Sequence, residues 1–89
     1  MVHVVFTANL ARHLHCPELE LPGSTVREVL DHYFAAHPQV RRYVLDDQNA
    51  LQRHVNVFVE DHPTLDRTRL SESVKDGQTI FVFQALSGG

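Results

Sequence analysis

The sequence predicts an α+β domain in which a mixed sheet of four or five strands packs on one main helix. Runs of alternating β-branched and aromatic residues occur near the start, the middle and the end of the chain. A single apolar stripe at helical spacing follows the first two runs. The chain has 89 residues, of which 43% are hydrophobic and 21% charged, as expected for one globular domain.

The first two strands are predicted to form an antiparallel hairpin. Residues 2–7 alternate between two faces, as the two-residue period of a strand requires. Residues 8–16 have no clear alternation and are expected to form a loop. Residues 18–21 alternate again, and Leu19 and Leu21 are expected to face inward.

The main helix is predicted over residues 26–36. Thr25 stands three residues before Glu28, which is the spacing of a capping box. Pro38 disfavours helical backbone at the residue before it and should end the helix. Residues 40–45 suggest a further short helical turn. The apolar stripe of the main helix consists of Val26, Val29, Leu30, Tyr33 and Phe34.

The second half of the chain is predicted to be mostly strands and turns. Residues 51–59 are expected to form the third strand, and residues 60–63 a turn. Residues 68–70 are a candidate short strand. Residues 71–74 are a candidate single helical turn.

The last strand is predicted over residues 79–83, after a turn at residues 75–78 in which Gly77 takes a positive φ. The resulting order is strand, strand, helix, strand, optional short strand, strand. One helix across such a sheet is the ubiquitin-like β-grasp architecture. In it the first and last strands lie side by side and parallel at the centre of the sheet.

The outer sheet face is predicted to carry an apolar patch. Val5, Phe58, Phe81 and Phe83 all alternate away from the positions expected to face the helix. Their strands are neighbours in the proposed order, so the four side chains should meet on an uncovered surface. Such a patch indicates a protein interface. The alternative is a one-residue error in register, which would place the same residues in the core.

Composition excludes several classes of protein. A formal net charge of −3, with acids and bases interspersed, argues against nucleic-acid binding. No apolar stretch is long enough for a membrane span. The first residues lack the basic region of a signal peptide. Cys16 is the single cysteine, so no internal disulfide can form, and a cytoplasmic location is expected.

No catalytic or metal site is expected within the chain. His13, His15 and Cys16 lack a second ligand pair at metal-binding spacing. No nucleophile, base and orienting residue are grouped in the sequence, and no glycine-rich phosphate loop is present. The chain is therefore predicted not to be an enzyme and to bind no cofactor itself.

The sequence closes on Leu86, Ser87, Gly88 and Gly89, and this ending predicts chemistry at the terminal carboxylate. Glycine lacks a Cβ, so the last two residues can enter a narrow channel, and no side chain shields the carbonyl carbon. Residues 1–83 are predicted to form the domain and residues 84–89 a flexible tail. Fully extended, residues 84–89 reach about 20 Å. Taken alone, such an ending is more often a simple flexible tail than a reactive terminus.

A resemblance to a known family spans nearly the whole chain. The MoaD/ThiS sulfur-carrier proteins have a similar ordered set of segments, which here read Val4-Val5-Phe6, Leu21-Pro22-Gly23-Ser24-Thr25-Val26, Leu51-Gln52-Arg53-His54-Val55-Asn56-Val57-Phe58-Val59, Val74-Lys75-Asp76-Gly77-Gln78 and Ala85-Leu86-Ser87-Gly88-Gly89.

The resemblance implies a carrier whose Gly89 carboxylate is adenylated and then converted to a thiocarboxylate, with Gly88 beside the reacting group. The implied partners are an E1-like adenylating enzyme that uses ATP, a sulfur donor and an acceptor synthase, such as the large molybdopterin-synthase subunit. Docking is expected through the apolar patch and through Leu86 and Ser87. The family usually has proline where Gln84 stands, and its absence should leave the root of the tail less rigid.

Several alternatives stay open on the sequence alone. Molybdopterin synthesis ranks first as the pathway, synthesis of cysteine or another thio-metabolite second, and thiamin third. A protein modifier joined through Gly89 to target lysines would have the same fold and tail, and a non-covalent interaction domain is a third interpretation. Exposed cations (Arg41, Arg42, Arg67, Arg69) could meet an acidic partner or simply be solvated, and Lys75 could accept a covalent link or simply be exposed.

Overall fold

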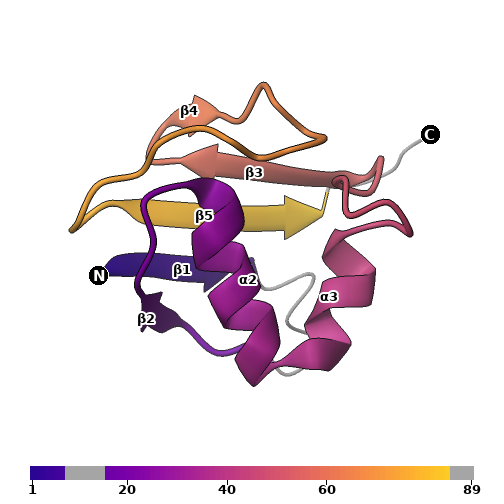
Figure 1. Cartoon of the computed structure of the whole chain (residues 1–89), viewed down its shortest axis with the longest axis horizontal. Coiled ribbons are helices and arrows are strands. Elements are labelled where there is room, and N and C mark those ends of the chain that lie inside the picture. The colour runs from indigo at the N-terminus through magenta and orange to yellow at the C-terminus, as the bar shows by residue number, and fades with distance from the viewer. Residues whose placement is uncertain (8–15, 85–89) are drawn as a thin grey trace.

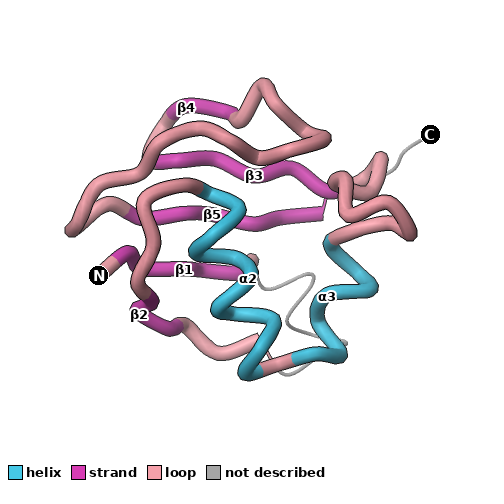
Figure 2. The backbone as a smooth tube through the Cα atoms, viewed as in Figure 1, coloured by secondary structure: helices cyan, strands magenta, loops and turns pink. Residues whose placement is uncertain are grey.

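The computed structural model describes residues 1–7 and 16–84. Its strands form one five-stranded sheet in the order β2-β1-β5-β3-β4, and the helices lie on one side of it (Figures 1 and 2). The elements are β1 (Val2–Phe6), β2 (Leu19–Leu21), α2 (Val26–Ala36), α3 (Pro38–Val44), β3 (Val55–Val59), β4 (His62–Pro63) and β5 (Thr79–Gln84).

The centre of the sheet is the predicted parallel pair of first and last strands. β1 and β5 run parallel, with Val4 opposite Ile80 and Phe6 opposite Val82. β2 pairs antiparallel with β1, as predicted for the hairpin, and β3 pairs antiparallel with β5. A mixed sheet with the helices on one side of it confirms the predicted α+β class. Helix α3 is a second, shorter helix at the predicted position.

Helix α2 begins and ends where the sequence predicts. The Thr25 hydroxyl accepts a hydrogen bond from the Glu28 backbone N–H at 3.2 Å. The Glu28 carboxylate in return accepts from the Ser24 backbone N–H at 2.9 Å, so the capping box closes one residue earlier than its usual form. Ala36 is the last residue of α2, and Pro38 opens α3, where its missing N–H costs no hydrogen bond.

The core lies between the helices and the inner face of the sheet. The five apolar residues of the α2 stripe are all buried. On the central strands, Val4, Val57, Ile80 and Val82 are at most 1% exposed. The Tyr33 hydroxyl, within this core, donates to the Pro17 carbonyl at 2.8 Å. A buried hydroxyl with such a partner avoids the penalty of an unsatisfied polar group.

The edge of the sheet differs from the prediction. The sequence predicts a turn at residues 60–63, but His62 and Pro63 pair with β3 as the short edge strand β4. Residues 68–70 are not a strand. The carbonyls of Thr68 and Arg69 accept hydrogen bonds from the Arg27 guanidinium, and the Asp66 carboxylate accepts from the Arg69 N–H at 3.0 Å. These bonds occupy the groups that a strand would use for pairing.

Two further boundaries also differ. β3 begins at Val55 rather than at residue 51, because Leu51 pairs instead with Leu45 in an isolated bridge. Residues 71–74 do not form a helical turn. The Val74 N–H donates to the Ser24 carbonyl at 2.9 Å, so the segment crosses to the start of α2 instead of bonding to itself. The turn before β5 has Gly77 at φ +90°, as predicted.

Candidate functional site

The four residues of the predicted apolar patch lie on the sheet face that the helices leave uncovered. The strands bury alternate residues toward the helices, and the intervening side chains face the other way. Val5, Phe58 and Phe83 are half-buried, and Phe81 is 38% exposed. We call Val5, Phe58, Phe81 and Phe83 the phenylalanine patch.

Strand register brings the patch together. Val5 on β1 lies opposite Phe81 on β5, and Phe81 lies opposite Phe58 on β3. The three side chains therefore form one row across the three central strands. The Phe83 ring lies against the Phe58 ring, with centroids 5.3 Å apart and planes at 42°. Pro63 of the edge strand is the next partner of Phe58 in the ladder.

The far end of the same sheet face is polar. His3 on β1 lies opposite Glu20 on β2 and Thr79 on β5. The His3 imidazole is 3.2 Å from the Glu18 carboxylate. The Thr79 N–H donates to the Glu60 carboxylate at 2.6 Å. The face thus has a charged end near the start of β5 and an apolar end near its last residues.

The patch and the tail are joined by β5. Phe81 and Phe83 lie on this strand, which continues through Gln84. Gln84 pairs with Val55 of β3, so the first residue of the predicted tail lies in the sheet. The other tail residues singled out from the sequence lie outside the described residues: Leu86, Ser87, Gly88 and Gly89.

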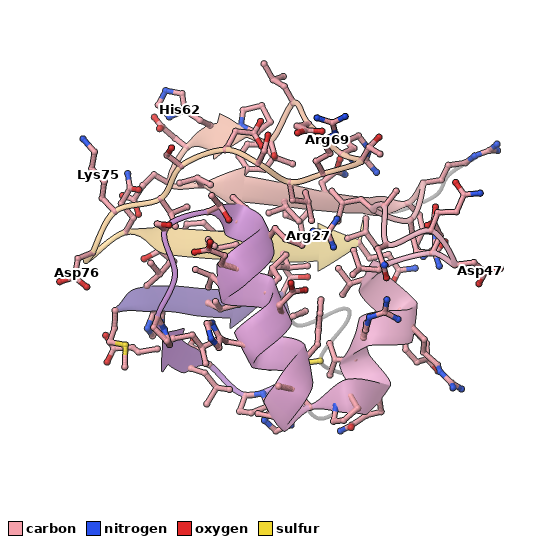
Figure 3. The ribbon with its side chains drawn as sticks, in the orientation of Figure 1. Arg27, Asp47, His62, Arg69, Lys75 and Asp76 are labelled. Carbon is pink, nitrogen blue, oxygen red and sulfur yellow. The ribbon has the colours of Figure 1, made fainter. Side chains whose placement is uncertain are left out.

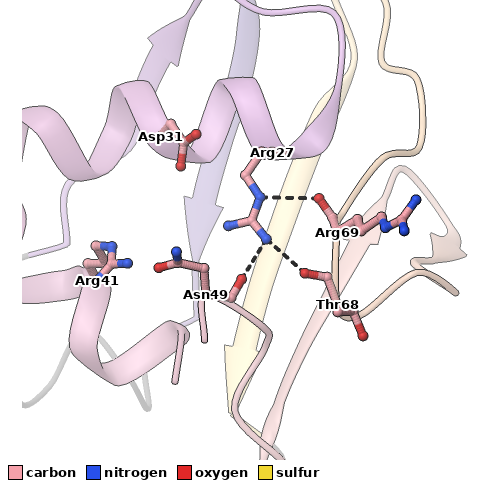
Figure 4. Close-up of a pocket in the computed structure, with 6 residues that line it drawn as sticks. All are labelled: Arg27, Asp31, Arg41, Asn49, Thr68 and Arg69. Carbon is pink, nitrogen blue, oxygen red and sulfur yellow. Dashed lines mark hydrogen bonds between the residues drawn. The ribbon is translucent and has the colours of Figure 1, made fainter. Parts of the chain in front are cut away.

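A concavity of roughly 400 Å³ lies on the helix side of the molecule. The Arg27 guanidinium of α2 sits at its centre and donates to the carbonyls of Asn49, Thr68 and Arg69 (Figure 4). These bonds tie α2 to two loops, so Arg27 holds the scaffold together. No local pattern in the sequence indicates this role, because the three acceptors are more than 20 residues away along the chain.

Among the four arginines considered from the sequence for partner binding, Arg67 has a structural role. Its guanidinium donates to the carbonyls of Gln52 and Val55, both at 2.7 Å, and to the Asn56 side chain at 3.3 Å. The free solvation considered for Arg67 is therefore wrong, and its contact with an acidic partner stays a prediction. Arg41, Arg42 and Arg69 are exposed.

The described residues contain no group of three or more side chains able to hold a metal ion. Of the residues considered for such a site, His13 and His15 lie outside the described part, and Cys16 is buried. Burial raises the pKa of the Cys16 thiol, so it stays protonated and weakly nucleophilic. No helix within residues 1–7 and 16–84 is long and apolar enough to cross a bilayer.

Comparison with solved structures gives several close folds. A chain of the Amycolatopsis orientalis BexX/CysO complex has a TM-score of 0.83 and 29% identity over 100% of both chains. Haloferax volcanii SAMP1 has a TM-score of 0.78 and 26% identity, over 99% of this chain and 98% of its own. Mycobacterium tuberculosis CysO has a TM-score of 0.81 over 97% and 100%, and at 21% identity it supports the fold alone.

No curated protein matches the chain significantly. The sequence model of the ThiS family, in contrast, matches residues 4–89, which include the diglycine and all four residues of the phenylalanine patch. The fold agrees with the ubiquitin-like β-grasp predicted from the order of the elements. The chain therefore belongs to the ThiS family, the family of sulfur carriers that its sequence resembles.

Proposed function

We propose that this protein carries sulfur as a thiocarboxylate at Gly89 and docks on its partners through the phenylalanine patch. The observation that carries the proposal is the continuity of β5: the strand that displays Phe81 and Phe83 runs into the segment that ends in the diglycine. A partner that covers the patch would thereby fix the point from which the tail departs. The family match through Gly89 gives independent support.

The chemistry follows from the reactivity of a carboxylate. Its negative charge repels nucleophiles, so an E1-like adenylating enzyme first joins the Gly89 carboxylate to AMP from ATP and releases pyrophosphate. The acyl adenylate has a good leaving group. A sulfur nucleophile from the donor then attacks the carbonyl carbon and AMP departs. Once the donor has released the sulfur, Gly89 carries a thiocarboxylate, which is nucleophilic toward the acceptor metabolite.

The carrier itself needs only reach and a docking surface. Residues 85–89 extend about 17 Å beyond β5 when straight, which is enough to enter a deep active site. Glycines at the last two positions permit a narrow channel. The buried thiol of Cys16 offers no accessible nucleophile, so both the ATP and the sulfur chemistry are assigned to partners. The protein thus acts as a cosubstrate.

For the pathway, we propose molybdopterin synthesis first and synthesis of cysteine or another thio-metabolite second. In the molybdopterin case the acceptor is the large synthase subunit. Reconstitution with each acceptor synthase distinguishes the two, because only the correct synthase consumes the thiocarboxylate and regenerates the free carboxylate.

Intact mass spectrometry tests the activation step. The protein is incubated with ATP, a candidate adenylating enzyme and a sulfide source. We expect a mass gain equal to the replacement of one oxygen by sulfur, and no gain for a chain that lacks Gly89. A gain that persists without Gly89 would place the sulfur elsewhere and refute the proposal.

A protein modifier is the second candidate. The observation that favours it is the 26% identity with SAMP1, since Haloferax volcanii SAMP1 is a small archaeal modifier protein. In that case a target lysine attacks the activated Gly89 carbonyl in place of sulfur. Isopeptide adducts in cell extract would support this function. Unchanged function after deletion of Gly88 and Gly89 would instead indicate a non-covalent interaction domain.

A further inference from the structure

The amines of this chain are few and lie together. Lys75 is the single lysine in the sequence; the other basic residues are arginines and histidines. The α-amine of Met1 lies at the same end of the molecule, because the Gly77 N–H donates to the Met1 carbonyl at 2.9 Å. The amines of this chain that an activated acyl group could acylate therefore lie in one small region.

The turn that carries Lys75 is well defined. The Lys75 N–H donates to the Gln78 side chain at 2.8 Å, and the Gln78 N–H donates back to the Lys75 carbonyl at 3.1 Å. Gly77 completes the turn at φ +90°. The Lys75 side chain is exposed and projects from the end of the molecule (Figure 3). It is presented on a fixed backbone and is open to solvent.

The two amines differ in their surroundings. The Met1 ammonium forms an ion pair with the Asp76 carboxylate. Within the described part of the chain, the Lys75 ammonium has no such partner. Lys75 is therefore the amine that an incoming acyl group can reach without first breaking an ion pair.

The geometry favours reaction between two copies. Lys75 precedes β5, and Gln84, after which the tail continues in the sequence, is the last residue of β5, so Lys75 and Gln84 lie at opposite ends of this strand (Figure 1). The five steps from Thr79 to Gln84 span about 17 Å at a strand rise of roughly 3.3 Å per residue. Residues 85–89 also span about 17 Å when extended. A tail that folded back along its own strand would therefore reach only the start of β5 and would stop short of the Lys75 turn. A second copy has no such constraint.

We propose that Lys75 is the acceptor through which one copy of this protein is joined to the next. The inference rests on the activation of Gly89 put forward under the proposed function. The unprotonated Lys75 amine attacks the Gly89 carbonyl of another copy's acyl adenylate. An isopeptide bond forms, AMP leaves with the electrons of the broken acyl–oxygen bond, and the nitrogen gives its extra proton to solvent. ATP is the only co-reactant.

A single acceptor at one end and a single donor at the other give one type of linkage. The link is head-to-tail and therefore heterologous, so it can repeat from one copy to the next and build a linear chain. The phenylalanine patch lies on the sheet face, toward the end of β5 that is away from the Lys75 turn. A link at Lys75 therefore leaves the docking surface of the acceptor copy open, and a partner with several binding sites would gain from the repeated patches.

The test uses one donor and one acceptor variant. The donor carries Lys75→Arg with an intact tail, and the acceptor keeps Lys75 but lacks Gly89. The two are mixed with ATP and the adenylating enzyme, without sulfide. We expect a covalent dimer from the mixture, with the link mapped to Lys75 by peptide mass spectrometry, and no dimer from either variant alone.

Four results would overturn the inference. A dimer linked through the Met1 amine would show that Lys75 is not the acceptor. Wild-type chain that loses one water without dimerising would show ring closure. No dimer, although the donor forms a thiocarboxylate when sulfide is added, would refute conjugation and leave the proposed function standing. A donor that forms no thiocarboxylate would refute the proposed function and this inference with it.

Discussion

Phe81 provides the sharpest test of the docking surface, because its exposed area sets the expected loss of affinity. The residue is 38% exposed. A phenylalanine offers about 150–250 Å², so the free part is about 57–95 Å². At about 25 cal/mol per Å², covering that part contributes about 1.4–2.4 kcal/mol. Phe81→Ala should therefore raise the Kd for the adenylating enzyme by about 10–60-fold.

Titration calorimetry with the adenylating enzyme measures this affinity, and urea unfolding measures stability in the same variants. Tyr43→Ala is the matched surface control, because Tyr43 on α3 is 45% exposed but lies on the helix side of the molecule. Its removal should leave the Kd unchanged. Ile80→Ala is the core control: Ile80 is 0% exposed on the same strand, and its truncation should cost about 2–5 kcal/mol of stability.

The relative losses of affinity and stability in the three variants distinguish a docking surface from a core position. Phe81→Ala should lose affinity while losing clearly less stability than Ile80→Ala. If Phe81→Ala unfolds the protein as readily as Ile80→Ala does, the side chain belongs to the core. If it folds normally and binds as tightly as the Tyr43→Ala control, the patch is not the docking surface.

The remaining predictions concern the scaffold, and urea or thermal unfolding checks each. Arg27→Met should cost about 1–3 kcal/mol, since three carbonyls lose a charged donor; an unchanged stability would mean that water replaces it. Gly23→Ala should destabilise, because an added Cβ would lie 2.7 Å from Val29 Cγ2, and a stable variant would require that α2 shift. Burial opposes ionisation of Glu72, but hydrogen bonds from Thr64 and two backbone N–H groups outweigh it and lower its pKa. The resulting stability is present above the usual glutamate pKa and is lost as pH falls through the lower folded value, so Glu72→Gln should flatten the acid limb of the stability profile.

The helix and the central strands could be predicted from the sequence because their signals are local. The α2 stripe, the Thr25 cap and the break at Pro38 act within a few residues of one another, and all three are found in the structure. The alternation of β1 and β5 likewise determines which side chains share a face. That periodicity is sufficient to place Val5 and Phe81 on the outer face, provided that the order of the strands is right.

The edge of the sheet could not be predicted in this way. His62 and Pro63 have poor strand propensity, yet they pair with β3, because Pro63 at an edge needs no N–H partner on its open side. Residues 68–70 have better strand character but form a loop, since Arg27 takes the carbonyls of Thr68 and Arg69. Contacts over some 40 residues of chain override local propensity there.

The family, the α+β class, the main helix and the residues of the phenylalanine patch could all be predicted from the sequence, because each depends on short-range periodicity or on an ordered set of motifs. The folded structure was needed to show which residues meet: the contact of the Phe58 and Phe83 rings, the hydrogen bonds of the Arg67 guanidinium to backbone carbonyls, and the position of the Lys75 turn beside Met1. These features depend on pairing register and on long-range hydrogen bonds, which no local pattern specifies.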